Sequence, residues 1–317
     1  MQLSQQSDNT QRAFLPMVSL VDFETEHPDK VAQRKAASAH FRALDDKERL
    51  DHVKGLMIIG KAFEELGAYA KHDADWTQQL TQLPPSVFKF GVRAMLDVLP
   101  TRSNLFRWNK RASNTCPHCH ERVDTLLHQL NHCGPMLRAG KYTWRHNSVL
   151  QYIAALLLPL LTTGFKLLVD LPRPHPCSYS DFPADIAITA RRPDILILNR
   201  TARTIYLVEL TVPYEENLAS SARRKQEKYE GLVRDIEAAG WKCQLFTVEI
   251  GSRGILSKPV SALLNGLARV KATRGVSQAE IKQASQVVSQ IALRCSYLIY
   301  LTRHSTVFDI DRPLLTV

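Results

Sequence analysis

The sequence predicts an α+β protein, in which a helical N-terminal region and a small Cys/His-rich module precede an α/β core with C-terminal helices. Apolar residues recur at helical spacing through the first third of the chain, whereas short β-branched runs alternate with amphipathic stretches from residue 145 onward. The 317 residues suffice for about two domains. The hydrophobic fraction of 44% and the charged fraction of 23% are ordinary for a folded soluble protein.

The net charge of +10 at pH 7 favours an anionic partner, and nucleic acid is the first candidate. Residues 1–27 lack hydrophobic periodicity and are expected to be flexible, and they contain no apolar segment of the kind a signal peptide needs. The most apolar run, Val149 to Leu161, is shorter than the roughly 20 residues that cross a bilayer. With six cysteines and no secretory signal, we expect a reducing compartment and no disulfide framework.

Residues 28–115 form the expected helical region. Their apolar residues recur every three or four positions up to Gly67, which is a helix-stop signal. A further helix is expected from Phe88 to Leu99, where Pro100 ends it.

The end of this region, residues 101–115, is basic and carries two aromatic side chains. One interpretation is a solvated linker whose aromatic residues pack on the core. The other is a nucleic-acid contact, in which the cations bind phosphates and Trp108 stacks on a base. Both interpretations stay open, and the residues that would bind nucleic acid are Arg102, Arg107, Trp108, Lys110 and Arg111.

Residues 116–144 are expected to form a small zinc knuckle. Cys116 and Cys119 have the two-residue separation of such a knuckle, and His128 and Cys133 complete a set of four ligands. Three of the six cysteines fall in this short segment, which favours zinc over the alternative of small buried thiols. The histidine is the least defined ligand, because three others lie nearby in the sequence: His118, His120 and His132.

Residues 145–303 alternate between helical and strand patterns, and residues 304–317 form a tail. The expected order is a helix, a strand, a Pro-rich loop, two strands with a hairpin-length link, a long charged helix, a strand and two C-terminal helices. The corresponding residues are 145–158, 165–171, 172–190, 194–198, 205–212, 218–239, 243–250 and 259–303.

Two acidic residues occur on the paired strands of this core. Asp194 stands at the start of the first strand, and Glu209 lies inside the second, where an unpaired buried carboxylate is costly. Lys225 and Tyr229 share one face of the helix that follows, because they are four positions apart. Two carboxylates beside a lysine suit Mg²⁺ and an activated water. The alternative is that Asp194 merely begins a strand and Glu209 faces solvent.

The combined pattern resembles a known family of mobile-element proteins. The order of helices and strands, with acids on the second and third strands, resembles the restriction-like (PD-D/E-x-K) nuclease core. The wider likeness, over roughly residues 80–303, is to the C-terminal part of site-specific non-LTR retrotransposon (R-element) reverse transcriptase proteins. It rests on the zinc knuckle followed by Arg145-His146-Asn147, Pro193-Asp194, Glu209 and Lys225-x-x-x-Tyr229.

The resemblance implies a role for each of these residues. Asp194 and Glu209 would bind a catalytic Mg²⁺ or Mn²⁺. Lys225 would orient the attacking water or steady the phosphate, and Tyr229 would support it. Contacts with DNA, or with the groups around the metal, would come from Arg145 and His146.

Two positions depart from the family pattern. Asn147 stands where many members have Asp, and Thr211 stands where the catalytic lysine usually follows the acid. The lysine would therefore have moved to the helix at Lys225. Lys228, one residue away from the shared helix face, competes for that role.

The resemblance implies a metal-dependent DNA endonuclease that nicks target DNA for target-primed reverse transcription, with a structural Zn²⁺ in the knuckle. We expect DNA as the partner, RNA as a further candidate, no membrane, and a nuclear location. Family members carry a polymerase upstream, but Asp45-Asp46 here lies at an expected helix boundary without the flanking hairpin of a polymerase. Residues 28–115 would then be a linker or thumb-like remnant in a truncated or domesticated protein. The alternative is a nuclease-inactive zinc-knuckle protein that only binds nucleic acid.

Overall fold

The computed structural model describes residues 29–56, 60, 82–254, 259–305 and 308. The chain divides into two compact units, Met1–Gly55 and Leu56–Val317. The expected flexible segment at residues 1–27, the helix stop at Gly67 and most of the expected tail lie outside the described residues.

The described part of the first unit is one long helix, α2 (Lys30–Lys54). Asp29 begins it, because its carboxylate accepts hydrogen bonds from the backbone N–H groups of Val31 and Ala32. The helix boundary expected at Asp45-Asp46 is wrong, since α2 continues through both residues. Asp45 instead forms an exposed ion pair with Arg49, one helical turn later, at 2.7 Å.

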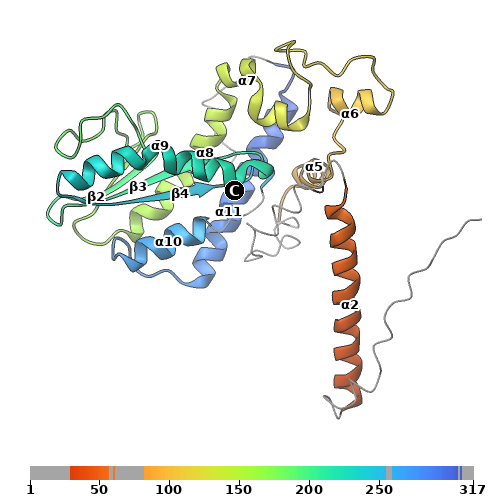
Figure 1. The fold of residues 1–317 in the computed structure, drawn as a ribbon, viewed down its shortest axis with the longest axis horizontal. Coiled ribbons are helices and arrows are strands. Elements are labelled where there is room, and N and C mark those ends of the chain that lie inside the picture. Colours follow the sequence, from red (N-terminus) through yellow and green to blue (C-terminus); the bar gives the residue numbers. More distant parts are fainter. Residues whose placement is uncertain (1–28, 57–59, 61–81, 255–258, 306–307, 309–317) are drawn as a thin grey trace, which may run out of the picture. The chain divides into compact units, whose positions relative to one another are not determined.

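The described part of the second unit is built around a four-stranded mixed sheet (Figure 1). The sheet confirms the predicted mixture of helices and strands. The first three strands pair antiparallel and the last two pair parallel. A parallel pair needs a crossover connection, which α9 (Leu218–Ala238) supplies. In spatial order the strands are β1 (Lys166–Val169), β2 (Ile195–Asn199), β3 (Thr204–Thr211) and β4 (Lys242–Glu249).

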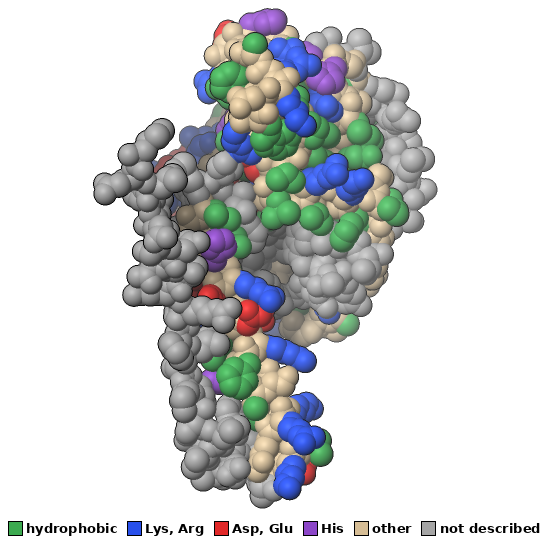
Figure 2. All heavy atoms as spheres, turned by 90° about the vertical axis from the view of Figure 1, so that its right-hand side faces the viewer, with side chains coloured by type: hydrophobic (Ala, Val, Ile, Leu, Met, Phe, Trp, Pro, Cys, Tyr) green, Lys and Arg blue, Asp and Glu red, His purple; other side chains and the backbone are tan. Residues whose placement is uncertain are grey.

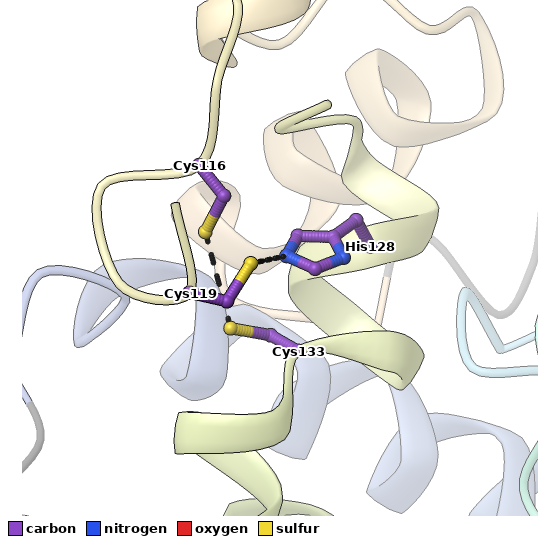
Figure 3. Close-up of side chains that lie close together, drawn as sticks. All are labelled: Cys116, Cys119, His128 and Cys133. Carbon is purple, nitrogen blue, oxygen red and sulfur yellow. Dashed lines mark hydrogen bonds between the residues drawn. The ribbon is translucent and has the colours of Figure 1, made fainter. Parts of the chain in front are cut away.

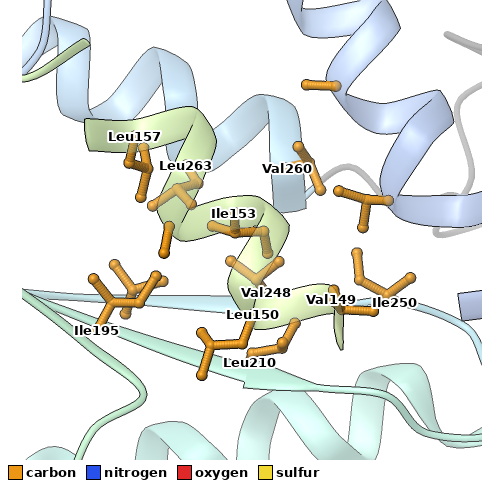
Figure 4. Packing of buried hydrophobic residues seen from close by; sticks show 14 of the residues in the cluster. Val149, Leu150, Ile153, Leu157, Ile195, Leu210, Val248, Ile250, Val260 and Leu263 are labelled. Carbon is orange, nitrogen blue, oxygen red and sulfur yellow. The ribbon is translucent and has the colours of Figure 1, made fainter. Parts of the chain in front are cut away.

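Helices cover both faces of the sheet, because the central strands are apolar on both sides. On β3, Val208 and Leu210 pack in one cluster, whereas Ile205 and Leu207 pack in another with residues of α9. Figure 4 shows the first cluster, in which residues of the sheet meet helices from before and after it. Those helices are α8 (Lys141–Leu157), α10 (Pro259–Arg269) and α11 (Gln278–Leu301).

A second, smaller core joins the helical region and the knuckle to the end of α11. The helix expected from Phe88 to Leu99 is α5 (Pro85–Met95), which ends earlier than Pro100 would require. Its last expected turn is replaced by a tight reversal in which Asp97 has a positive φ of 50°. Within the described part of the second unit, the short helices are α6 (Arg102–Arg107), η1 (His128–His132, a π-helix), α7 (Gly134–Arg138), η2 (Leu158–Leu160) and η3 (Glu215–Asn217).

Candidate metal centres and the surrounding surface

The structure brings Cys116, Cys119, His128 and Cys133 together, with their ligand atoms all within 4.8 Å of one another. Figure 3 shows the three sulfurs and the imidazole pointing toward one point. The Cys116 and Cys133 sulfurs are 3.9 Å apart, and the Cys119 sulfur is 3.5 Å from His128 Nε2. A tetrahedral zinc site requires about 3.8 Å between sulfurs and about 3.5 Å between sulfur and nitrogen, given its usual bond lengths. The cluster could therefore hold a metal such as zinc.

The protonation of these residues also fits a metal site. Burial lowers the pKa of His128, which favours the neutral ring that binds metals. Burial raises the pKa of Cys116, and it raises that of Cys133 to about 12. Burial alone would raise the pKa of Cys119 too, but backbone N–H groups that donate to its sulfur lower it overall. The two buried thiols would thus need a bound cation to ionise near neutral pH.

Residues that sequence reasoning missed hold the cluster in shape. The Tyr142 hydroxyl accepts a hydrogen bond from Cys133 N at 3.1 Å and donates to Gln129 O at 2.9 Å. The Asp124 carboxylate accepts from Gln129 Nε2 at 2.9 Å and from Arg102 N at 3.1 Å. Fixing the ligands from outside is the usual role of the residues around a metal site.

The knuckle is also attached to the strand that carries Glu209. Asn131, between the His128 and Cys133 ligands, donates its side-chain amide to Val212 O at 3.0 Å. Arg145 donates to the same carbonyl at 3.1 Å and to Ser296 Oγ at 2.9 Å. Arg145 is only 1% exposed. Its expected contact with DNA is therefore wrong, because its guanidinium group is used inside the protein.

The two acids of the core lie opposite each other across the β2–β3 pair. Ile195 pairs with Val208, so the next positions along the antiparallel register are Asp194 and Glu209. Leu210 N donates to Asp194 Oδ2 at 2.7 Å, and Asp194 N donates to Glu209 Oε2 at 3.3 Å. Glu209 is 2% exposed, so it does not face solvent as the alternative interpretation required.

Three side chains of α9 surround the Glu209 carboxylate. Lys225 Nζ contacts Glu209 Oε1 directly, and Lys228 Nζ lies 3.6 Å from the same oxygen. Lys228 also donates to the Tyr229 hydroxyl at 2.9 Å, which donates to Arg192 O at 3.1 Å. Burial and the charge of Asp194 raise the pKa of Glu209, and the charge of Lys225 opposes that rise. Lys225 and Tyr229 therefore lie near the acids, as their helix spacing predicts, and Lys228 lies beside them.

His146 lies on the other side of the acid pair. Its Nε2 is 3.3 Å from Asp194 Oδ2, and its Nδ1 is 3.2 Å from Asn147 Oδ1. Burial opposes the charged imidazolium, but the hydrogen bond and the charge of Asp194 outweigh it and raise the pKa of His146. A pocket of about 730 Å³ opens here, and its lining includes His146, Asn147, Asp170, Ser180, Arg192 and Asp194.

Glu249, the last residue of β4, is a further buried acid that the sequence analysis did not single out. It lies on the same face of the sheet as Glu209, because Glu209 is in register with Thr247 and side chains alternate along a strand. Burial raises the pKa of Glu249 from its ordinary value of 4.5 to about 7, although a hydrogen bond with Thr247 opposes the rise.

This raised pKa predicts a pH-dependent effect of Glu249→Gln on stability. The folded state of the wild type binds the proton more tightly than the unfolded state, so it loses stability as pH rises from about 4.5 to about 7. The loss is roughly 3 kcal/mol at most. We expect Glu249→Gln to have little effect at pH 4.5 and to raise the free energy of unfolding at pH 8, measured by urea denaturation. A stability difference that stays constant across this range would contradict the assignment.

In the basic stretch of residues 101–115, which includes α6, some cations contact groups of the protein and others are exposed. Arg102 Nη1 donates to Thr115 O at 3.4 Å, and Arg107 Nη1 lies 3.8 Å from an Asp97 oxygen. Trp108 is 38% exposed, and two further cations at the surface are Lys110 and Arg111. The face of the molecule in Figure 2 shows Lys and Arg side chains among hydrophobic ones at the top, at the height of α6.

A comparison of the sequence with protein-family models found no match, and a comparison with curated proteins found none either. Of the helices in the described ranges, none combines the length and the apolar character that crossing a membrane requires.

Proposed function

We propose that this protein is a metal-dependent DNA endonuclease with a restriction-like core, and that it nicks target DNA for a non-LTR retrotransposon. The observation that carries the proposal is the opposed pair Asp194 and Glu209 with Lys225 on the buried carboxylate. Burying two acids side by side raises the free energy of the folded protein, so a structural role alone explains the pair poorly.

The arrangement of the core supports the same proposal. A helix, three antiparallel strands, a crossover helix and a parallel strand follow one another in the order of a restriction-like core. Asp194 immediately precedes the second strand and lines the pocket, and Glu209 lies opposite it inside the third strand. A nuclease of this kind needs its carboxylates at such an opening, where a phosphate can reach them.

The donor set fits a hard divalent cation. Carboxylate oxygens are the ligands that Mg²⁺ and Mn²⁺ prefer, and one or two carboxylates together with phosphate oxygens suffice. When bound, such an ion supplies a more acidic water and compensates charge on the phosphate.

The surrounding residues of the chain position these groups. The hydrogen bond from Leu210 N fixes the Asp194 carboxylate, and His146 Nε2 contacts the same oxygen. Lys225 is a cation at the Glu209 carboxylate, from which it can orient a water or a phosphate oxygen. Tyr229 anchors α9 to the segment before β2 through Arg192 O.

The exposed basic stretch supplies a candidate contact for the nucleic acid. Trp108, Lys110 and Arg111 offer an aromatic ring and two cations at the surface. The knuckle would hold Zn²⁺ as a structural ion, with Cys and His ligands filling all four positions. In this proposal the knuckle shapes a binding surface, and the acid pair carries the chemistry.

The test is nicking of supercoiled plasmid with and without added Mg²⁺. We expect nicking by the wild-type protein only with Mg²⁺, and no nicking by Glu209→Gln. Glu237→Gln is the matched control, since it removes the same charge from an exposed position of α9 and should nick normally. DNA binding by the wild-type protein without any nicking would instead favour a nuclease-inactive nucleic-acid-binding protein.

The two lysines of α9 are expected to differ in their effect on the chemical step. Lys225 contacts Glu209 and is less exposed than Lys228, whose ammonium group lies 3.6 Å from the acid. We expect Lys225→Ala to slow single-turnover nicking by about 10²–10⁴-fold, the usual size of proton-transfer or positioning assistance. Lys228→Ala should slow it far less. A slow Lys228→Ala beside a normal Lys225→Ala would assign the role to Lys228.

A further inference from the structure

We propose that a cationic surface formed by Arg122 of the knuckle and by Arg223 and Arg224 of α9 binds the phosphate backbone of duplex DNA and leads it to the acid pair. We call this surface the α9 track. The inference rests on the proposed function, because it names where the substrate of the acid pair lies. It is separate from the basic stretch of residues 101–115.

Charge is distributed unevenly along α9. Its first part, residues 218–229, contains four cations and one acid, whereas residues 230–238 contain one cation and three acids. Helix stability favours the opposite order, with acids near the N-terminus and cations near the C-terminus. The cations therefore gather at the end of α9 that carries Lys225 for a reason other than the stability of the helix.

The three arginines of the α9 track are exposed at the surface. In the described ranges of the chain none of them forms an ion pair. By contrast, Arg192, Arg200 and Arg253 are each paired with an acid. Arg224 contacts Ser221 Oγ at 3.5 Å, a neutral partner that leaves its charge uncompensated. Exposed arginines without an acidic partner can form bidentate contacts with phosphate.

The α9 track runs between the knuckle and the acid pair. Arg122 lies in the knuckle between its Cys119 and His128 ligands, and Arg223 and Arg224 lie early in α9, in the turn that also carries Lys225. The hydrogen bond from Asn131 to Val212 O attaches the knuckle three residues beyond Glu209. Arg224 is next to Lys225, the residue that contacts Glu209. A phosphate backbone on these arginines would therefore reach the turn of α9 that carries Lys225, the residue that contacts Glu209.

The experiment compares two triple variants that remove the same charge. Arg122→Ala/Arg223→Ala/Arg224→Ala removes the α9 track. The control variant is Lys166→Ala/Arg234→Ala/Lys242→Ala, which removes three exposed cations elsewhere on the core. Lys166 and Lys242 lie at the end of the sheet away from the acids, and Arg234 lies in the acidic half of α9. Binding of a duplex DNA oligonucleotide is measured by fluorescence anisotropy against salt concentration, without added Mg²⁺ so that no strand is cut.

We expect the track variant to lose about 0.9 in the slope of log affinity against log salt for each phosphate contact removed, while the control keeps the wild-type slope. Arginine-to-lysine replacement at the same three positions should restore most of the slope, because the charges are kept. Equal slopes for the track and control variants would overturn the proposal. So would a loss of affinity that is confined to single-stranded RNA of the same length.

Two further measurements distinguish a loss of DNA contacts from a loss of folding and from a loss of nuclease activity. Zinc content and the thermal melt should match between the track variant and the wild type, and if they do not, the pair Arg223→Ala/Arg224→Ala is compared instead. Nicking by the wild type reports on the proposed function, whereas the salt slope reports on the α9 track. A reduced slope in a protein that never nicks would support the track and reject the nuclease.

Discussion

Replacing Asp194 by asparagine is expected to lower the rate of DNA nicking by several orders of magnitude while DNA affinity holds or rises. The carboxylate is a ligand for the proposed divalent ion, and asparagine removes its charge while keeping its shape. Because both the nucleophile and the charge stabilisation depend on that ion, losing the ligand removes most of the catalysis. DNA affinity should not fall, since one negative charge near the phosphates has gone.

The fold should tolerate this change. Leu210 N donates to Asp194 Oδ2, and the amide oxygen of asparagine can accept the same hydrogen bond. Asp235→Asn is the matched control, because Asp235 is an exposed acid in the last turn of α9, in its acidic half. Single-turnover nicking at saturating Mg²⁺ and DNA binding by anisotropy are measured for all three proteins. If Asp194→Asn nicks at the wild-type rate, the acid pair is not the catalytic site.

The sequence predicted the position of these acids because the determining features are local. Alternation along two short apolar strands and a hairpin-length link place Asp194 and Glu209 near each other. The four-residue spacing on one helix then places Lys225 and Tyr229 on a common face. The four ligands of the knuckle were predicted for the same reason, since cysteine spacing encodes geometry over a few residues.

Features that depend on distant parts of the chain could not be predicted in this way. The resemblance implies that Arg145 contacts DNA or the groups around the metal, yet its guanidinium group is buried and donates to Val212 O and Ser296 Oγ. Glu215 and Arg253 form a buried ion pair at 2.6 Å, with the guanidinium group over the ring of Tyr214. No pattern in the sequence connects these positions, because the contacts arise only when the knuckle, α5 and α11 pack on the core.

The ends of the long helix α2 could not be predicted from local propensity. The adjacent acids Asp45 and Asp46 predict the start of a new helix, because Asp is favoured at the N-cap position. In α2 the two residues are exposed within a continuous helix, and Asp45 pairs with Arg49. Local propensity therefore located the helix but not its ends.

Loss of the metal from the knuckle is expected to have the largest effect on stability. We expect one Zn²⁺ per molecule in the wild type and a marked loss of zinc in Cys119→Ser. A structural zinc contributes about 10–16 kcal/mol of apparent binding free energy in small zinc modules. That amount is comparable to the whole free energy of unfolding of a typical domain, which is about 5–15 kcal/mol.

The structure indicates how far this loss should spread. Cys116 and Cys133 are buried in the core that also contains residues of α5 and α11, so releasing them should loosen that core. Asn131 would also lose its fixed position at Val212, near the end of the strand that carries Glu209. We therefore expect Cys119→Ser to lower the melting temperature, and to lower nicking even at temperatures where the protein remains folded.

Cys177→Ser is the matched control for this experiment. Cys119 and Cys177 are both half-buried free thiols, but only Cys119 belongs to the cluster. Zinc is measured by elemental analysis of the purified proteins, and stability is measured by thermal melting with and without a chelator. Chelation should destabilise the wild type and Cys177→Ser equally and should change Cys119→Ser little. Equal zinc in Cys119→Ser and the wild type would show that these four residues do not form the metal site.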